Sequence, residues 1–247
     1  MPKFFVNRSQ INNGYISILG EDAHHISRSL RMAVGEHIVV SDMQRTEYDC
    51  VLEDFLDGCV RAKIEKEWQA DTELDINIHL FQALPKGEKL DFIIQKSVEC
   101  GVCDITPFES ERCVVKCKSD AEERKKDRRN KIALEAAKQS GRGIVPPVNS
   151  TVSFEKMLVE AEKSDLVLFC YEGEGTEPIG KILAEMKTKE IKDISIIIGS
   201  EGGFSLDEAV MAGSKGFLKT GLGKRILRTE TAAIFALSCL VYEFELS

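Results

Sequence analysis

Before residue 70, the apolar positions of the chain come in short runs rich in β-branched and aromatic residues, which are typical of strands. These runs predict strands at residues 3–6, 15–18, 37–41, 48–53 and 60–66. One helical pattern lies among them, with Asp22 as a candidate N-cap and Gly35 at its end. The apolar face of that helix is formed by Ile26, Leu30 and Ala33. Residues 1–70 therefore predict a small, mainly β domain with one helix.

After residue 70, strand and helix patterns alternate. The polar stretch 67–73, which holds the only Trp, is predicted to be a linker. Strands are then predicted at residues 76–81, 104–108, 166–170, 194–199 and 216–220. Helices are predicted at 87–101, 121–140, 154–162, 179–187, 205–213 and 229–243. This alternation predicts an α/β domain over residues 71–247, with a mostly parallel sheet and helices on both of its faces.

The composition predicts a globular protein and gives no sign of a membrane span. With 43% hydrophobic and 30% charged residues, the chain is expected to be globular rather than disordered. It has no apolar run of the roughly 20 residues that cross a bilayer. Its first residues lack the apolar core of a signal peptide, so we expect a cytoplasmic protein whose eight cysteines are mostly thiols.

The net charge of −8 argues against a general polyanion binder, but its distribution is uneven. Residues 112–142 carry eleven Lys and Arg against five Asp and Glu, and residues 221–231 carry three against one. Local fields, not net charge, decide contacts with nucleic acid. For residues 122–131, the alternative to a contact with nucleic acid is a helix face whose charges are solvated.

The first candidate site is a glycine-rich turn after an apolar strand, in the run IIIGSEGGFS at 196–205. Glycines let backbone groups approach a ligand closely, and ligands of open α/β sheets bind at the carboxyl ends of strands. Ser205 is a candidate N-cap for the helix that follows. The spacing matches neither a dinucleotide fingerprint nor a P-loop. A structural tight turn is the alternative to a ligand-binding loop.

The second candidate site is the run LGKRILRTET at 222–231. A predicted strand end meets Gly223, then three cations, then a helix start with Thr229 as a candidate N-cap and Glu230 in the first turn. The alternative is a capped helix with a cationic lead-in. Two glycine loops at strand ends, one with a carboxylate and one cationic, favour a shared site.

The cysteine spacing is loosely zinc-like, but no metal is predicted. Cys100 and Cys103 are followed by Cys113 and Cys117. Cys100 falls in an amphipathic helix pattern and Cys103 at a strand start, where small buried hydrophobic residues explain both. The remaining cysteines fall in apolar stretches and are expected in the core.

The two loops together resemble the RsmE family of bacterial rRNA methyltransferases, through IIIGSEGGFSLDEA and LGKRILRTETAA. HHISRSLRMAVGEHI, KGEKLDFIIQKSVECGVCDITPFESERCVVK and QSGR at 139–142 extend the resemblance over most of the chain. One departure is Ser200, where the family usually has proline. Proline would stiffen that turn.

The resemblance implies a SPOUT-type fold, a knotted and mostly parallel sheet with a deep C-terminal trefoil knot. It also implies an N-terminal small β-barrel resembling a PUA-type RNA-binding domain. The family works as a homodimer, without a metal. It transfers a methyl group from S-adenosylmethionine (SAM) to N3 of one uridine in 16S rRNA of the small ribosomal subunit. The apolar helix 231–243, with Ile234, Leu237, Leu240 and Val241, is expected to pack either within the knot or across the two-fold axis of the dimer.

Site residues follow from this resemblance and from the chemistry of methyl transfer. Arg228 is expected to stabilise negative charge on the uracil, and either Glu201 or Glu230 to accept the N3 proton or to hold Arg228. The expected SAM-binding residues are Tyr171, Glu172, Gly199, Ser200, Glu201, Gly202, Leu222, Gly223, Arg225, Ile226 and Leu227. At Gly202 a side chain is expected to intrude into the pocket.

Contacts to RNA are expected from cations in several places. His24, Arg28 and Arg31 share a helical face by their spacing, and the alternative is that they are ordinary polar side chains on the surface. The full expected RNA-binding set is His24, Arg28, Arg31, Arg112 and Arg142, and the basic helix is expected to extend the phosphate track. Two other functions stay open: a SPOUT methyltransferase acting on another RNA such as tRNA, and a non-catalytic RNA-binding assembly factor.

Overall fold

A computed structural model of the chain describes residues 1–116 and 119–247, with the side chains of 1–116 and 122–247. These residues form two compact units. The first contains Met1–Glu73 and Ala137–Val145, and the second contains Leu74–Ala136 and Pro146–Ser247. The division after Glu73 lies near the predicted boundary at residue 70. The return of Ala137–Val145 to the first unit is a feature that the sequence analysis did not predict.

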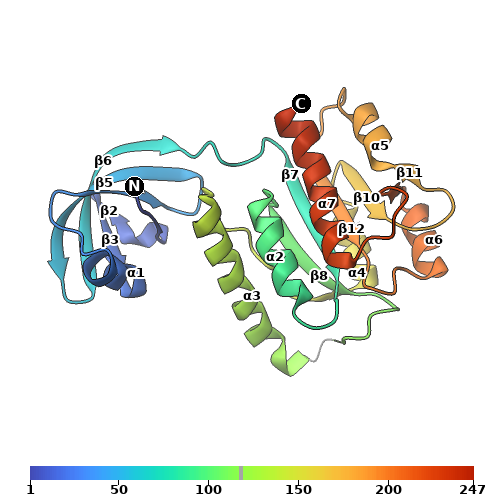
Figure 1. Cartoon of the computed structure of the whole chain (residues 1–247), viewed down its shortest axis with the longest axis horizontal. Helices are drawn as coiled ribbons and strands as arrows, with labels where there is room; N and C mark the ends of the chain where they lie inside the picture. Colours follow the sequence, from blue (N-terminus) through green and yellow to red (C-terminus); the bar gives the residue numbers. More distant parts are fainter. Residues whose placement is uncertain (117–118) are drawn as a thin grey trace. The chain divides into compact units, whose positions relative to one another are not determined.

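The first unit, whose strands are blue to cyan in Figure 1, is built on a six-stranded sheet. The strand order is β1-β4-β5-β6-β3-β2. The strands are β1 Lys3–Phe5, β2 Ile11–Asn12, β3 Tyr15–Leu19, β4 His37–Ser41, β5 Thr46–Leu56 and β6 Cys59–Gln69. All pairs are antiparallel except β1 with β4. Alternate residues such as Ile16 and Ile18 point into one buried cluster. Strands β1 and β2 form the two edges of this sheet among the described residues, and the PUA-like barrel stays a prediction of the resemblance.

The predicted linker at 67–73 is wrong in its first half. Strand β6 continues to Gln69, and Trp68 pairs with Glu47 of β5. The side chains from Glu65 to Gln69 are mostly exposed, so this end of the strand lacks the apolar alternation by which a sequence indicates a strand.

The helix of the first unit is shorter than predicted and starts earlier. It consists of α1, Gly20–His24, followed by a π-helical turn η2, His25–Ser29. Asp22 lies inside α1 and forms an ion pair with Lys138, so it is not an N-cap. Ile26 is buried as expected, but Leu30 and Ala33 are exposed.

A buried ion pair fastens Ala137–Val145 to the rest of the first unit. Arg142 pairs with Glu73, and their side chains are only 4% and 3% exposed. Glu73 also accepts the backbone N–H groups of Gly143 and Ile144 at 2.9 and 3.3 Å. Burial raises the pKa of Glu73, but these donors outweigh it and hold that pKa below its ordinary value. The carboxylate therefore stays ionised, and breaking such a pair costs about 3–5 kcal/mol.

The second unit contains a seven-stranded, fully parallel sheet with the order β11-β13-β10-β12-β7-β8-β9. Its strands are β7 Asn77–Ala83, β8 Asp104–Glu109, β9 Val152–Ser153, β10 Leu166–Cys170, β11 Glu177–Pro178, β12 Asp193–Ile198 and β13 Leu218–Gly221. Its helices are α2 Lys89–Glu99, α3 Ser119–Ser140, α4 Phe154–Ala161, α5 Ile179–Met186, α6 Leu206–Ser214 and α7 Thr229–Val241, followed by η3 Tyr242–Leu246. The last four residues of α3 belong to the first unit.

The predicted parallel sheet is confirmed by these pairings. The continuous apolar runs of the sequence form its central strands. Helix α7 packs against α2, α5 and β12, while α4 packs against β7, β8 and β9. Strand β10 lies between β12 and β13, so the chain passes β10 on its way from β12 through α6 to β13. The trefoil knot stays a prediction of the resemblance. Among the described residues, no helix is long and apolar enough to span a membrane.

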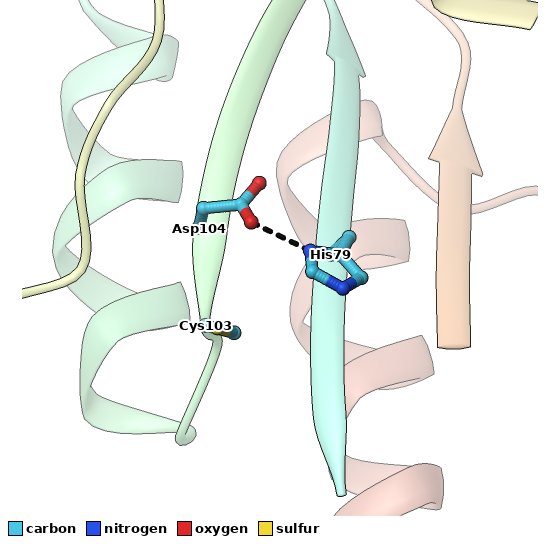
Figure 2. Close-up of side chains that lie close together, drawn as sticks. All are labelled: His79, Cys103 and Asp104. Atoms are coloured by element: carbon cyan, nitrogen blue, oxygen red, sulfur yellow. Dashed lines mark hydrogen bonds and ion pairs between the residues drawn. The ribbon is translucent and has the colours of Figure 1, made fainter. Parts of the chain in front are cut away.

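His79 lies between two carboxylates at the amino ends of β7, β8 and β12. Its Nδ1 is 2.6 Å from Oδ2 of Asp104 (Figure 2), and its Nε2 is 3.2 Å from Oδ1 of Asp193. Cys103 lies nearby, so atoms of the kinds that bind metals meet here. Both ring nitrogens already face carboxylate oxygens, which a protonated imidazole satisfies as a double donor. The hydrogen bond to Asp104 is the largest cause that raises the pKa of His79 above its ordinary value, against the effect of burial.

This arrangement predicts a pH-dependent contribution to stability. The folded-state pKa of His79 is raised above the unfolded value of about 6.5. The contribution is therefore fully present below the unfolded pKa and disappears as the pH rises through the folded pKa. We expect His79→Gln to lower the free energy of unfolding by about 1 kcal/mol near pH 6, because the ring is mostly buried. The loss should become smaller toward about pH 9, where the imidazole gives up its proton.

Urea denaturation of both proteins across this pH range measures the effect. His24→Gln, a change at an exposed histidine of the first unit, is the control. A difference between the native protein and His79→Gln that does not change with pH would show that the ring is not held as a cation.

Candidate active site

Three loops meet around a cleft of about 950 Å³ at the carboxyl edge of the parallel sheet. They follow β10, β12 and β13, which are neighbours in the sheet and run in the same direction. The volume lies within the range of small-molecule sites. All the residues predicted to bind SAM line this cleft, together with Arg112 and Arg228.

The loop between β12 and α6 needs its glycines for close packing. A Cβ added at Gly199 would lie 3.1 Å from the ring of Phe204 and 3.3 Å from Cα of Gly203. Gly203 has a φ of +63°, which favours glycine. Phe204 is buried beneath the loop, with its ring centroid 4.3 Å from that of Phe169. This aromatic contact anchors the turn to the sheet.

The end of this loop forms as the sequence predicts. The hydroxyl of Ser205 accepts the N–H of Glu208, and the Glu208 carboxylate accepts the N–H of Ser205 at 2.9 Å. The carbonyl of Ser200 accepts the N–H of Gly203 at 2.9 Å. The turn therefore closes with serine at the position where the resembled family usually has proline.

The expectation for Gly202 needs correction. A Cβ at Gly202 would meet the Cβ of Arg112 at 3.0 Å, so a side chain would push against the segment that carries Arg112 before it filled the cleft. Arg112 also donates from Nη1 to the carbonyl oxygen of Gly202 at 3.0 Å. The two residues form one wall of the cleft.

The loop between β13 and α7 brings the cations to the cleft. Gly223 has a φ of +111°, which lets the chain turn there. Lys224, Arg225 and Arg228 are exposed along it. Arg228 is the N-cap residue of α7 by its backbone, so the predicted N-cap at Thr229 is wrong.

Thr229 instead joins three segments of the sheet edge. Its hydroxyl donates to the carbonyl oxygen of Gly199 at 2.6 Å and accepts from Nε2 of Gln82 at 2.9 Å. Gln82 is fully buried near the end of β7. This network fixes the start of α7, and with it Arg228, relative to the loop after β12.

The two candidate proton acceptors lie in different surroundings. Glu201 lines the cleft, whereas Glu230 lies on the first turn of α7 and is absent from the described lining residues. Lys89 Nζ lies 2.9 Å from Glu201 and 3.5 Å from Glu230. Burial raises the pKa of Glu201, but Lys89 and backbone N–H groups outweigh it and hold that pKa below its ordinary value. Glu201 is therefore an ionised, weakened base.

Lys89 is a lining residue that the sequence analysis missed. A lysine at a helix start is usually a solvated residue, and no pattern in the sequence links it to Glu201, more than a hundred positions away. Its only local signal is its place directly after a glycine-containing turn at the end of β7.

Among the described cysteines, Cys170 lines the cleft, and Cys103 and Cys113 lie apart from each other. Burial raises the pKa of the Cys170 thiol to about 12, so this lining residue stays a thiol. Cys103 lies at the start of β8, whereas Cys113 lies beyond the other end of that strand. Cys117 lies outside the described residues.

The predicted RNA-binding residues differ in accessibility. His24, Arg28 and Arg31 are exposed, but Arg31 follows η2 with a φ of +53°, so the regular helical face expected for the three is interrupted. Arg142 is buried in its pair with Glu73, and its prediction as an RNA contact is therefore wrong.

The basic helix α3 also holds cations that are used within the fold. Arg129 is 5% exposed and donates to Glu122 at 3.0 Å. Arg128 donates to Asp91 from Nη2 at 2.8 Å. Arg129 is therefore used inside the second unit and is unavailable to RNA, whereas the Arg128 side chain is 59% exposed and stays part of the expected phosphate track.

Known proteins match the whole chain. A family model described as an RNA methyltransferase domain matches residues 72–241. A Bacillus subtilis protein named ribosomal RNA small subunit methyltransferase E is 34% identical over 100% of this chain and 98% of its own length. A namesake from Buchnera aphidicola is 30% identical over 97% of this chain and 92% of its own.

Solved structures agree with these relatives. A methyltransferase from Legionella pneumophila with bound SAM has a TM-score of 0.83 and 31% identity, covering 97% of this chain and 96% of its own. A ribosomal RNA small subunit methyltransferase E from Neisseria gonorrhoeae, bound to SAM, has a TM-score of 0.82 and 30% identity, covering 98% and 97%. The fold is thus SPOUT-type, and the chain belongs to the RNA methyltransferase family that includes ribosomal RNA small subunit methyltransferase E.

Proposed function

We propose that this enzyme transfers a methyl group from SAM to N3 of a uridine in small-subunit 16S rRNA, as a cytoplasmic homodimer acting on the assembled subunit. The observation that carries the proposal is the cleft in which both glycine loops and Arg228 meet. Relatives named for small-subunit rRNA methylation over nearly their full length support the substrate.

The residues of the cleft fit SAM. Peptide groups of the turns at Gly199–Gly203 and Leu222–Leu227 line it, and such groups can hydrogen-bond an adenine edge and a ribose. Ile198, Leu222 and Leu227 supply apolar walls for a flat base. When bound, SAM supplies a methyl group that is already activated, so the protein mainly has to orient the donor and the acceptor.

The protein must also stabilise the negative charge that develops on the uracil. Loss of the N3 proton places negative charge on the base, and the Arg228 guanidinium at the cleft can stabilise it. Glu201 is the better-placed proton acceptor because it lines the cleft, whereas Glu230 is not among the described lining residues. The lowered pKa of Glu201 makes it a modest base, so stabilisation by Arg228 carries more of the catalysis.

Arg228→Ala tests this assignment. If Arg228 acts only during transfer, turnover should fall by about 100- to 1000-fold while SAM affinity stays unchanged. Arg228→Lys should recover only part of the rate, because an ammonium does not reproduce the planar fork of a guanidinium. Methyl transfer to small subunits and calorimetry with SAM measure the two effects. Normal turnover of Arg228→Ala would mean that the residue is structural.

The first unit is proposed to hold rRNA through the exposed cations Arg28 and Arg31. Each phosphate contact changes the slope of log affinity against log salt by about 0.7–0.9. Arg28→Ala with Arg31→Ala should therefore weaken rRNA binding and flatten this slope, with SAM affinity unchanged.

Lys63→Ala is the matched control for this experiment. Lys63 is an exposed cation of the same unit that pairs with Glu65 at 3.1 Å. Filter binding at a series of salt concentrations compares the variants. An unchanged slope in the double variant would remove Arg28 and Arg31 from the interface.

The proposed homodimer needs an exposed apolar surface. Leu237 and Leu240 are fully buried within the subunit, which supports packing inside the fold rather than across a two-fold axis for this part of α7. Exposed apolar side chains lie at Ile226 and Leu206, which both line the cleft, at Val210 one turn along α6, and at Phe235 on α7. The residues beside the cleft are proposed as the interface. An interface there would place a second subunit beside the active site.

Ile226→Glu tests the dimer surface. Ile226 is 85% exposed, so the change should leave folding intact and place a charge in the interface. Light scattering at micromolar concentration should give roughly twice 27.6 kDa for the native protein and a lower mass for the variant. A native monomer, or an unchanged dimer in the variant, would contradict this surface.

A further inference from the structure

Lys89 is the first residue of α2 and lies between two acidic side chains from separate segments. Its Nζ is 2.9 Å from Oε1 of Glu201, in the loop after β12, and 3.5 Å from Oε2 of Glu230, in the first turn of α7. The same oxygen of Glu201 accepts the backbone N–H of Lys86 at 3.1 Å. One cation therefore connects the loop after β12, the start of α7 and the turn before α2.

The contact to Glu230 matters because of burial. Glu230 Oε2 is inaccessible to solvent and makes no hydrogen bond within the described part of the chain. The ion pair with Lys89 therefore offsets the cost of burying this charged oxygen. A buried carboxylate without a countercharge is costly. Without Lys89, two carboxylates at the ends of two site loops would lose their shared cation.

Each carboxylate belongs to a segment that carries part of the proposed reaction. Glu201 lies in the loop whose backbone lines the cleft, and Glu230 lies two residues after Arg228. The network of Gln82 and Thr229 joins the same two segments through neutral hydrogen bonds at the buried side. Lys89 joins them on the side of the cleft, where its own side chain is 32% exposed.

We propose that Lys89 is a positioning residue for methyl transfer: it clamps Glu201 and Glu230 together and so fixes the cleft-lining loop after β12 relative to Arg228. This inference rests on the proposed active site. Lys89 does not touch the reacting atoms in this role. It acts through the two carboxylates, and it also keeps Glu201 ionised, as the lowered pKa of that residue supports.

The test compares Lys89→Met with Lys96→Met. Lys96 lies on the same helix, is 34% exposed and pairs with Glu99, so it matches Lys89 in type and exposure. Lys89→Met should weaken SAM binding by about tenfold and lower kcat, with the KM for the small subunit unchanged, because the RNA-binding cations lie elsewhere. Lys96→Met should behave like the native enzyme.

Rescue and coupling distinguish a clamp from a general structural role. Lys89→Arg keeps the cation and should restore most of the SAM affinity. In a double-mutant cycle, Glu230→Gln should recover part of the loss in the Lys89→Met background, because the unpaired charge is gone. Far-UV circular dichroism checks folding, and Lys89→Gln repeats the cycle with a polar end if Lys89→Met does not fold.

Two results would overturn the clamp: SAM affinity and kcat of Lys89→Met equal to those of Lys96→Met, or no coupling between positions 89 and 230. Arg228→Ala, assayed alongside, keeps this outcome separate from a failure of the proposed site. If Arg228→Ala loses turnover while Lys89→Met keeps it, only the clamp fails. If both keep full turnover, the proposed active site fails as well.

Discussion

Strands β10, β12 and β13 run side by side in one direction, and the site depends on this shared direction. Because their carboxyl ends meet at one edge of the sheet, the loops that follow them form a single cleft. A reversal of any one strand would carry its loop to the opposite edge, where His79 lies. The close packing of Gly199 on Phe204 and the hydrogen bond from Thr229 to Gly199 then hold two of these loops at a fixed spacing.

Charge in this acidic protein is organised by position rather than by number. Some cations are used inside the fold, as Arg129 and Arg142 show by their burial beside Glu122 and Glu73. Others reach the cleft, where Lys89 balances two carboxylates and Arg112 holds the carbonyl of Gly202. A net charge of −8 is therefore compatible with an RNA substrate, since the field near the substrate is set by a few exposed cations.

The order of elements in the second unit could be predicted because its strands are continuous apolar runs and its helices have clear ends. Ser205 shows this, since its capping box with Glu208 forms as expected. Glycine loops at strand ends likewise indicated the cleft. The hydrophobic pattern did not predict the end of β6 around Trp68, where the side chains on both faces are exposed, or the two-residue strands β2, β9 and β11, which are too short to show a period.

What the sequence could not predict are contacts between distant positions. Arg142 looked like a surface cation, but its partner Glu73 lies 69 positions away and no local pattern links them. Thr229 looked like a helix cap, but its hydroxyl is taken by Gly199 across the sheet edge. Lys89 was overlooked for the same reason. Pairings of this kind are set by topology, which the resemblance supplied only as a fold class.

The most direct test of the account is labelled methyl transfer from SAM to small ribosomal subunits that lack the modification, with tRNA assayed in parallel. Mass spectrometry of the digested RNA identifies the product nucleoside. The account predicts 3-methyluridine in the small-subunit RNA and no label in tRNA. Label in tRNA, a different methylated nucleoside, or SAM binding without any transfer would contradict it.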